Sequence, residues 1–222
     1  MFSFSNVMFL LKEYWQVFLF EGLRITLVLS AIAVFFGVIF GTFIAFGRMS
    51  KFKPLSFIAT AYIEVVRGTP LLLQFYFFVF LLPKLITFME LSTFTSICIS
   101  LICNSAAYVA ELVRSGIQAV DKGQMEAARS LGMSHSQAMV KVIIPQAIKN
   151  ILPAVANEFV AIIKETSMAS TFFIGDLMTS YLKVKGATYL ALEGLIIVGV
   201  IYFVVTFSLT KLINYYERKL NA

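Results

Sequence analysis

The sequence is poor in charged residues. Only 14% of its 222 residues are Asp, Glu, Lys or Arg, and 59% are hydrophobic, whereas a soluble domain carries about 25% charged residues. This deficit favours a membrane protein. The formal net charge is +6, but the basic residues fall between apolar runs and do not form one stripe. The positive excess therefore indicates membrane topology and not nucleic-acid binding.

Residues that hold metals or carry out catalysis are also scarce. His135 is the single histidine, which excludes a multi-histidine metal site, and we expect it at the surface. Cys98 and Cys103 lie in one apolar run at a spacing typical of neither metal nor redox sites, so we expect small buried side chains. The apolar runs hold no nucleophile with its base and no paired aspartates, so an intramembrane enzyme is disfavoured. A phosphate-binding Gly-x-x-x-x-Gly-Lys-[Ser/Thr] motif is absent too.

Long apolar runs, by contrast, are abundant. A bilayer core of about 30 Å needs about 20 apolar residues in a helix. Five segments meet this requirement: residues 25–47, 55–82, 91–113, 151–173 and 190–212. The second contains Gly68 and Pro70, so we expect a helix broken near the middle of the membrane. The predicted fold class is an all-α membrane protein with five transmembrane helices.

Basic residues outside these segments predict the orientation. Most of them lie in residues 48–53, in the long loop that ends at residue 149, and in the C-terminal stretch that holds Lys211, Arg218 and Lys219. The positive-inside rule then places the C-terminus in the cytoplasm and the N-terminus outside. Residues 1–22 mix aromatic and charged side chains, which predicts a short interfacial helix. Residues 23–215 form the transmembrane domain.

A small-residue motif lies in the first predicted span. Gly37 and Gly41 are four residues apart, a spacing that lets two helix backbones approach closely. The motif fits packing within one subunit and dimerisation equally well.

The long cytoplasmic loop carries helix-capping signals over residues 121–145. Asp121 with Gln124, and Ser134 with Gln137, read as two capping boxes, and Gly132 reads as a helix stop. We expect two short helices, the second ending before Pro145. Their exposed apolar side chains suit either a groove on a partner protein or a self-packed hairpin; these are Met125, Leu131, Met133 and Met139.

The same loop resembles a known family. Glu126-Ala127-Ala128, followed by Gly132 and Pro145, is similar to the EAA loop of permeases in binding-protein-dependent ABC importers. Three further stretches resemble the polar amino-acid branch of that family, the histidine, glutamine and arginine type. They are residues 67–74, 107–114 and 157–167.

This resemblance implies the type I importer fold, with the loop as a coupling helix. Glu126, Ala127, Ala128 and Gly132 would then contact ATP-binding cassette ATPase subunits. ATP and Mg²⁺ would be bound by those subunits, and no cofactor by this chain. The implied location is the bacterial plasma (inner) membrane, among its lipids. The other implied partners are an extracytoplasmic amino-acid-binding protein and a second permease copy, favoured over a related permease.

Charged residues inside the spans are candidates for substrate contact, because ionisable groups are costly in a membrane. Glu64 with Arg67, and Glu111 with Arg114, are three apart on a helix and could neutralise each other. Arg67 and Thr69 adjoin the break in the second span, where they could donate hydrogen bonds to a substrate carboxylate.

Glu158 is the strongest candidate for substrate contact. Its helical neighbours three and four positions away are not basic, so its charge must be met across a helix interface or by a ligand. Asn157 adds a polar group beside it. A cationic amino-acid side chain would suit this carboxylate; an interhelical salt bridge to Arg67 or Lys164 is the structural alternative.

Together these features predict a permease that imports a polar amino acid, with arginine, lysine or histidine favoured. Glutamine, glutamate or another polar amino acid is the alternative substrate. A stand-alone channel or secondary transporter would usually need more helices or an inverted repeat.

Overall fold

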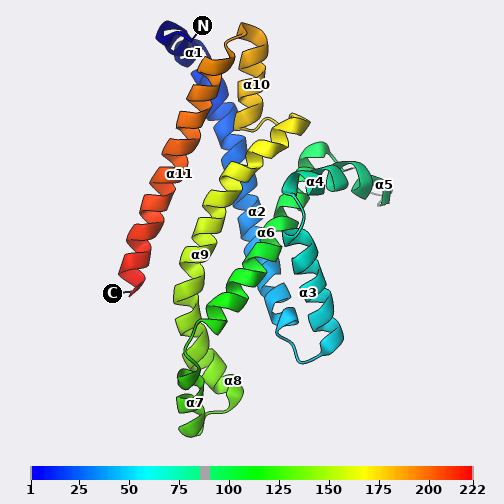
Figure 1. The fold of residues 1–222 in the computed structure, drawn as a ribbon, viewed down its shortest axis with the longest axis vertical. Helices are drawn as coiled ribbons and strands as arrows, with labels where there is room; N and C mark the ends of the chain where they lie inside the picture. The colour runs from blue at the N-terminus through cyan, green and yellow to red at the C-terminus, as the bar shows by residue number, and fades with distance from the viewer. Residues whose placement is uncertain (1, 86–90, 222) are drawn as a thin grey trace. The chain divides into compact units, whose positions relative to one another are not determined.

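The computed structural model describes residues 2–85 and 91–221, and every regular element in these ranges is a helix (Figure 1). The α-helices are α1 (Phe4–Gln16), α2 (Arg24–Arg48), α3 (Lys53–Arg67), α4 (Leu71–Tyr76), α5 (Leu82–Leu85), α6 (Thr93–Gln118), α7 (Lys122–Ser130), α8 (His135–Ala138), α9 (Ile144–Glu165), α10 (Leu177–Thr188) and α11 (Ala191–Asn221). Three π-helical turns, η1 (Val17–Leu23), η2 (Phe77–Leu81) and η3 (Met139–Ile143), and one 3₁₀ turn, η4 (Thr166–Phe172), join some of them.

Four helical stretches are long and apolar enough to cross a membrane: Phe4–Arg48, Thr93–Gln118, His135–Phe172 and Ala191–Lys219. A fifth candidate consists of Lys53–Arg67 and Leu71–Leu85, two helices bent by 107° at a short break. These stretches correspond to the five predicted spans. The break falls at Gly68–Pro70 as expected, because Pro70 is extended at φ −62° and ψ 136° and has no N–H to continue the helix.

Two expected helix ends differ from the structure. The N-terminal helix runs without interruption from Phe4 to Arg48, so the expected short helix is joined to the first span through η1; its interfacial position stays a prediction. The expected helix end before Pro145 is wrong, since helix continues through α8, η3 and α9. The π-helical turn η3 ends at Ile143, two residues before Pro145, and a π-helical turn is one of the irregularities that accompany a proline within a helix.

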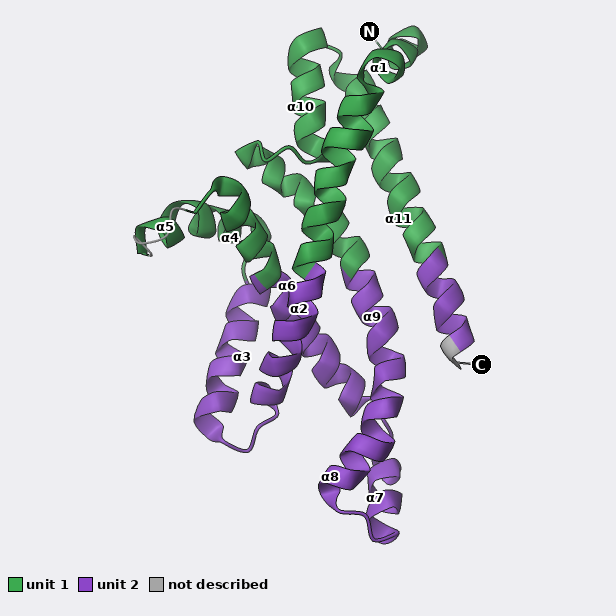
Figure 2. Cartoon of the chain, turned by 180° about the vertical axis from the view of Figure 1, so that it is seen from behind, with its two compact units in different colours: residues 1–33, 69–102, 159–211 green, residues 34–68, 103–158, 212–222 purple. Residues whose placement is uncertain are grey.

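The chain divides into two compact units (Figure 2). Unit 1 comprises Met1–Ala33, Thr69–Ile102 and Phe159–Lys211; unit 2 comprises Val34–Gly68, Cys103–Glu158 and Leu212–Ala222.

In unit 1, α1, α10 and the first part of α11 share one hydrophobic core. Its buried residues are Leu10, Phe18, Leu177, Tyr181, Val184, Ile197 and Val198. Two polar contacts add to this packing: the Ser3 backbone N–H donates to Glu193 Oε1 of α11 (3.1 Å), and the Leu177 N–H of α10 donates to Thr26 Oγ1 of α2 (3.0 Å). The N-terminal helix is therefore part of this unit's core.

In unit 2, α2 and α6 approach closely through the predicted small-residue motif. A side chain at Gly37 would come within 2.4 Å of Ser105 Oγ, and one at Gly41 within 2.6 Å of the Ala106 carbonyl oxygen. The two glycines therefore serve helix packing within one chain. Beside them lies a core of Ala45, Ile63, Val109, Ala110 and Val113.

Candidate functional site

The predicted coupling loop, residues 121–145, is a helical hairpin in unit 2, called the coupling hairpin below. Asp121 begins α7, its side chain accepting from the Gly123 N–H at 2.8 Å. The expected capping box with Gln124 is wrong, because the Gln124 Oε1 accepts instead from Gln146 Nε2 of α9 (3.2 Å). The second capping box is confirmed, with Ser134 and Gln137 bonded reciprocally.

Gly132 ends α7 in the left-handed conformation that was predicted, at φ 86°. The Met133 N–H donates to the Ala128 carbonyl (3.2 Å) and the Gly132 N–H to the Arg129 carbonyl (3.0 Å), which together make a Schellman cap. Leu131, at the tip, is 83% exposed. The hairpin thus has a fixed backbone and presents an apolar side chain outward.

The predicted coupling residues divide between surface and interior. Glu126 and Ala127 are exposed, whereas Ala128 is buried together with Ala138. The two small buried residues let α7 and α8 pack closely, so the hairpin does pack on itself on one side. Glu126, Ala127 and Leu131 lie outside that packing and can contact a partner.

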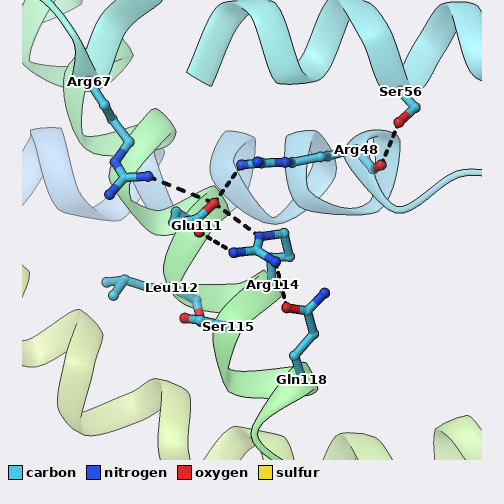
Figure 3. Close-up of polar contacts among 8 residues, drawn as sticks. All are labelled: Arg48, Ser56, Arg67, Glu111, Leu112, Arg114, Ser115 and Gln118. Carbon is cyan, nitrogen blue, oxygen red and sulfur yellow. Dashed lines mark hydrogen bonds and ion pairs between the residues drawn. The ribbon is translucent and has the colours of Figure 1, made fainter. Parts of the chain in front are cut away.

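Four charged side chains of unit 2 meet at Glu111, as Figure 3 shows. This arginine cluster consists of Glu111 with Arg48, Arg67 and Arg114, which come from α6, α2, α3 and α6. Arg48 Nη1 donates to Glu111 Oε2 at 2.5 Å, and the Arg114 guanidinium binds both carboxylate oxygens. Arg67 Nη1 lies 3.8 Å from Glu111 Oε2.

The arginine cluster is electrically unbalanced, since three guanidinium groups share one carboxylate and leave a formal charge of +2 within it. Its Arg114 pair was predicted from the sequence. The expected Glu64–Arg67 pair is wrong: Glu64 is exposed and is not among the ion pairs of residues 2–85 and 91–221, while Arg67 pairs with Glu111 and lies 5.3 Å from the Tyr108 ring centroid. Arg67 is nevertheless the most exposed of the three arginines, at 39% of its side chain.

Thr69 lies in the break between α3 and α4, two residues after Arg67. Both its carbonyl and its hydroxyl oxygen accept from Gln74 Nε2, at 3.2 and 3.1 Å. This contact fixes the extended segment that Pro70 begins. In the same unit, Phe75, Tyr76 and Phe80 pack edge-on or tilted against Phe172, which holds the short helices in place.

Asn157 and Glu158 lie in the second half of α9. Asn157 is exposed and Glu158 is half-buried. The helix that carries them is continuous with the coupling hairpin through η3, and Gln146 near its start bonds to Gln124. One helix therefore links the candidate coupling residues to the candidate substrate residues.

Two polar residues of these sites were not predicted from the sequence: Arg48 in the arginine cluster and Gln146 beside the hairpin. Arg48 was assigned only to the basic loop after the first span, yet it binds Glu111 across 63 residues of sequence. A contact so distant leaves no spacing signal in a single sequence.

Of the other expectations, His135 is exposed as predicted, whereas Cys98 and Cys103 are half-buried free thiols. No group of three His, Cys, Asp or Glu side chains that could hold a metal occurs in the described ranges.

Residues 37–222 match the family described as the inner membrane component of binding-protein-dependent transport systems. The chain belongs to this family. The permease is 42% identical over 205 residues to the arginine transport system permease protein ArtQ of Bacillus subtilis, covering 92% of this chain and 93% of ArtQ. It is 38% identical over 200 residues to the probable glutamine ABC transporter permease protein GlnM of the same species, covering 90% and 92%.

A solved structure gives the same assignment. The permease is 45% identical to a chain in the crystal structure of an amino acid ABC transporter with histidines, with a TM-score of 0.91 and 99% of each chain covered. The permease is therefore a multi-pass inner membrane subunit of an ABC amino-acid importer, in the polar amino-acid branch. ATP is bound by a separate ATPase, and a binding protein is a further partner.

Proposed function

We propose that this permease imports a basic amino acid, with Glu158 as the residue that binds the cationic side chain. Glu158 is a half-buried carboxylate on a membrane-spanning helix, and this observation carries the proposal. Ionisable groups on membrane-spanning helices are costly, which makes them candidates for substrate contact. The arginine permease ArtQ and the transporter solved with histidines, both similar to this chain, support the same preference.

The α-carboxylate of the substrate would be bound by Arg67 and Thr69. The formal charge of +2 in the arginine cluster attracts an anion, and Arg67 is its most exposed member. The backbone is broken beside Arg67, as in other transporters that use interrupted helices for substrate contact. Asn157 would add a hydrogen bond beside Glu158.

The orientation we propose has the N-terminus outside and the C-terminus in the cytoplasm. The coupling hairpin would then face the cytoplasm, with Glu126, Ala127 and Gly132 at the ATPase contact and Ala128 packed behind them. The segments 1–22, 23–215 and 216–222 would be the interfacial helix, the transmembrane domain and a cytoplasmic continuation of α11. Two copies of the chain would pair to complete the pathway.

Uptake by Glu158→Gln tests the substrate assignment. The variant should lower the apparent affinity for arginine, lysine or histidine about tenfold or more, because a hydrogen bond to a charged group contributes roughly 1.5–3 kcal/mol. Protein abundance should stay near wild type, as it should in the control Glu13→Gln on α1. Unaltered uptake of all three amino acids would remove Glu158 from the site.

A structural role for Glu158 gives a different result. If Glu158 bridges to Arg67, Glu158→Gln loses abundance and the double change with Arg67→Gln partly restores it.

Glutamine is the second candidate substrate, since GlnM is 38% identical to this chain. Import of glutamine in preference to the three basic amino acids would favour it.

A further inference from the structure

Helix α10 is flanked by two aromatic residues in an uncommon backbone conformation. Phe173, the C-cap of η4 and four residues before the start of α10, has φ 51°, and Tyr189, the C-cap of α10, has φ 61°. Among the described residues these two are the non-glycine positions with positive φ. The left-handed conformation costs roughly 1–2 kcal/mol for a residue with a side chain, and glycine is the usual residue at such a helix end.

Neither ring offsets this cost by burial. Phe173 is 69% exposed and Tyr189 is 89% exposed. Both line one hollow of about 350 Å³ in unit 1, whose other walls are Leu182, Lys185, Gly186 and Ala191. Two aromatic residues with a strained backbone therefore present their rings at a single surface depression.

The platform under the hollow is rigid. Asp176 begins α10, is fully buried, and accepts from the Met178 N–H (3.0 Å) and from the Thr179 hydroxyl. Burial raises the pKa of this carboxyl, although the Thr179 hydrogen bond acts in the opposite direction. Tyr181 and Val184 of the same helix lie in the core of unit 1. The hollow is thus a fixed surface feature.

The hollow has apolar walls and one cation, which sets the chemistry of its occupant. Lys185 is exposed, its Nζ lies 5.9 Å from the Tyr181 ring centroid, and it makes no ion pair in the described part of the chain. Lys183, two positions away, is paired with Glu21 at 3.4 Å. An aspartate or glutamate side chain on a protruding loop fits these walls and this charge.

We propose that the hollow of Phe173, Leu182, Lys185, Gly186, Tyr189 and Ala191 is a docking site for the binding protein, which inserts an acidic side chain there. The family requires a binding protein, and α10 follows α9 and η4 along the chain. The site rests on the proposed orientation, which places α10 outside. Aromatic rings that merely anchor α10 in the lipid interface are the competing explanation.

Substitution by glycine separates docking from folding. Phe173→Gly and Tyr189→Gly relieve the backbone strain, so thermal stability of the reconstituted complex should stay equal or rise. The concentration of liganded binding protein that half-maximally stimulates the ATPase should rise at least about fivefold, with basal ATPase unchanged. Lys185→Glu should raise this half-maximal concentration more, because the introduced glutamate repels the inserted carboxylate. Lys183→Glu is the matched control and should have a smaller effect.

Normal stimulation of Tyr189→Gly and Lys185→Glu would overturn the docking site. So would a benzoylphenylalanine at position 189 that cross-links to lipid and never to the purified binding protein. Lys183→Cys checks the orientation independently: if a membrane-impermeant reagent labels it only from the cytoplasmic side, the proposed orientation itself fails. Labelling from outside together with normal stimulation would refute only the docking site.

Discussion

At the scale of single residues, Glu111 is the most connected charge in the described chain. It accepts from Arg48 and Arg114 and lies near Arg67, so it joins α2 and α3 to α6. Guanidinium groups in apolar surroundings repel one another unless a carboxylate lies between them. Glu111 therefore stabilises unit 2 and also holds Arg67 in the position where we propose it contacts substrate.

Glu111→Gln should destabilise the permease. We expect a loss of about 1–3 kcal/mol, less than for a fully buried pair, because the side chains involved are partly exposed. Thermal unfolding of the purified complex measures the loss, and Arg48→Gln added to Glu111→Gln should recover part of it. Glu64→Gln on α3 is the control, since Glu64 is exposed; an equal loss in that control would contradict the account.

The local half of the arginine cluster could be predicted and the distant half could not. Glu111 and Arg114 are three residues apart on one helix, so their pairing follows from helix geometry. The same rule paired Arg67 with Glu64 and failed, because Glu111 of another helix, near Arg48, competes for the guanidinium. A single sequence records spacing along a helix but not which helices are adjacent.

At the scale of elements, the caps of the coupling hairpin could be predicted from the sequence. The continuation of its second helix through η3 into α9 could not. Asp121, Gly132 and Ser134 occupy the expected cap positions, since each signal depends on a few neighbouring residues. The helix end predicted at Pro145 was wrong because η3, a π-helical turn, has no signature that spacing alone reveals. The break at Pro70 was predicted because Gly68 and Pro70 both disfavour a continuous helix.

The conformation of Gly132 gives a prediction about coupling. Proline cannot adopt φ 86°, so Gly132→Pro should abolish ligand-stimulated ATPase and uptake while membrane insertion stays normal. Gly132→Ala should destabilise the hairpin by about 1 kcal/mol, a backbone effect, since an added Cβ meets nothing within 4 Å. Gly199→Ala on α11 is the matched control, because it also has open space but a helical backbone.

Gly199→Ala should leave uptake unchanged or slightly improve stability. Normal uptake by a well-expressed Gly132→Pro variant would show that the shape of the hairpin does not matter for coupling.

At the scale of the whole molecule, the proposed orientation predicts a labelling pattern. Cysteine at Lys51 or His135 should be protected from impermeant thiol reagents outside intact cells, and cysteine at Lys84 or Lys183 should react. All four positions are exposed in the structure, so access depends only on the side of the membrane. Cys98 and Cys103 are replaced beforehand. Labelling at His135 from outside would reverse the orientation and remove the cytoplasmic hairpin from the coupling scheme.

Reconstitution tests the central claim most directly. The permease, its ATPase and its binding protein are placed in liposomes, and uptake of radiolabelled arginine, lysine, histidine and glutamine is measured with and without ATP. We predict accumulation of a basic amino acid against its gradient, dependent on both ATP and the binding protein, and weakened by Glu158→Gln. Uptake that proceeds without ATP, or ATP-driven uptake of glutamine alone, would contradict the account.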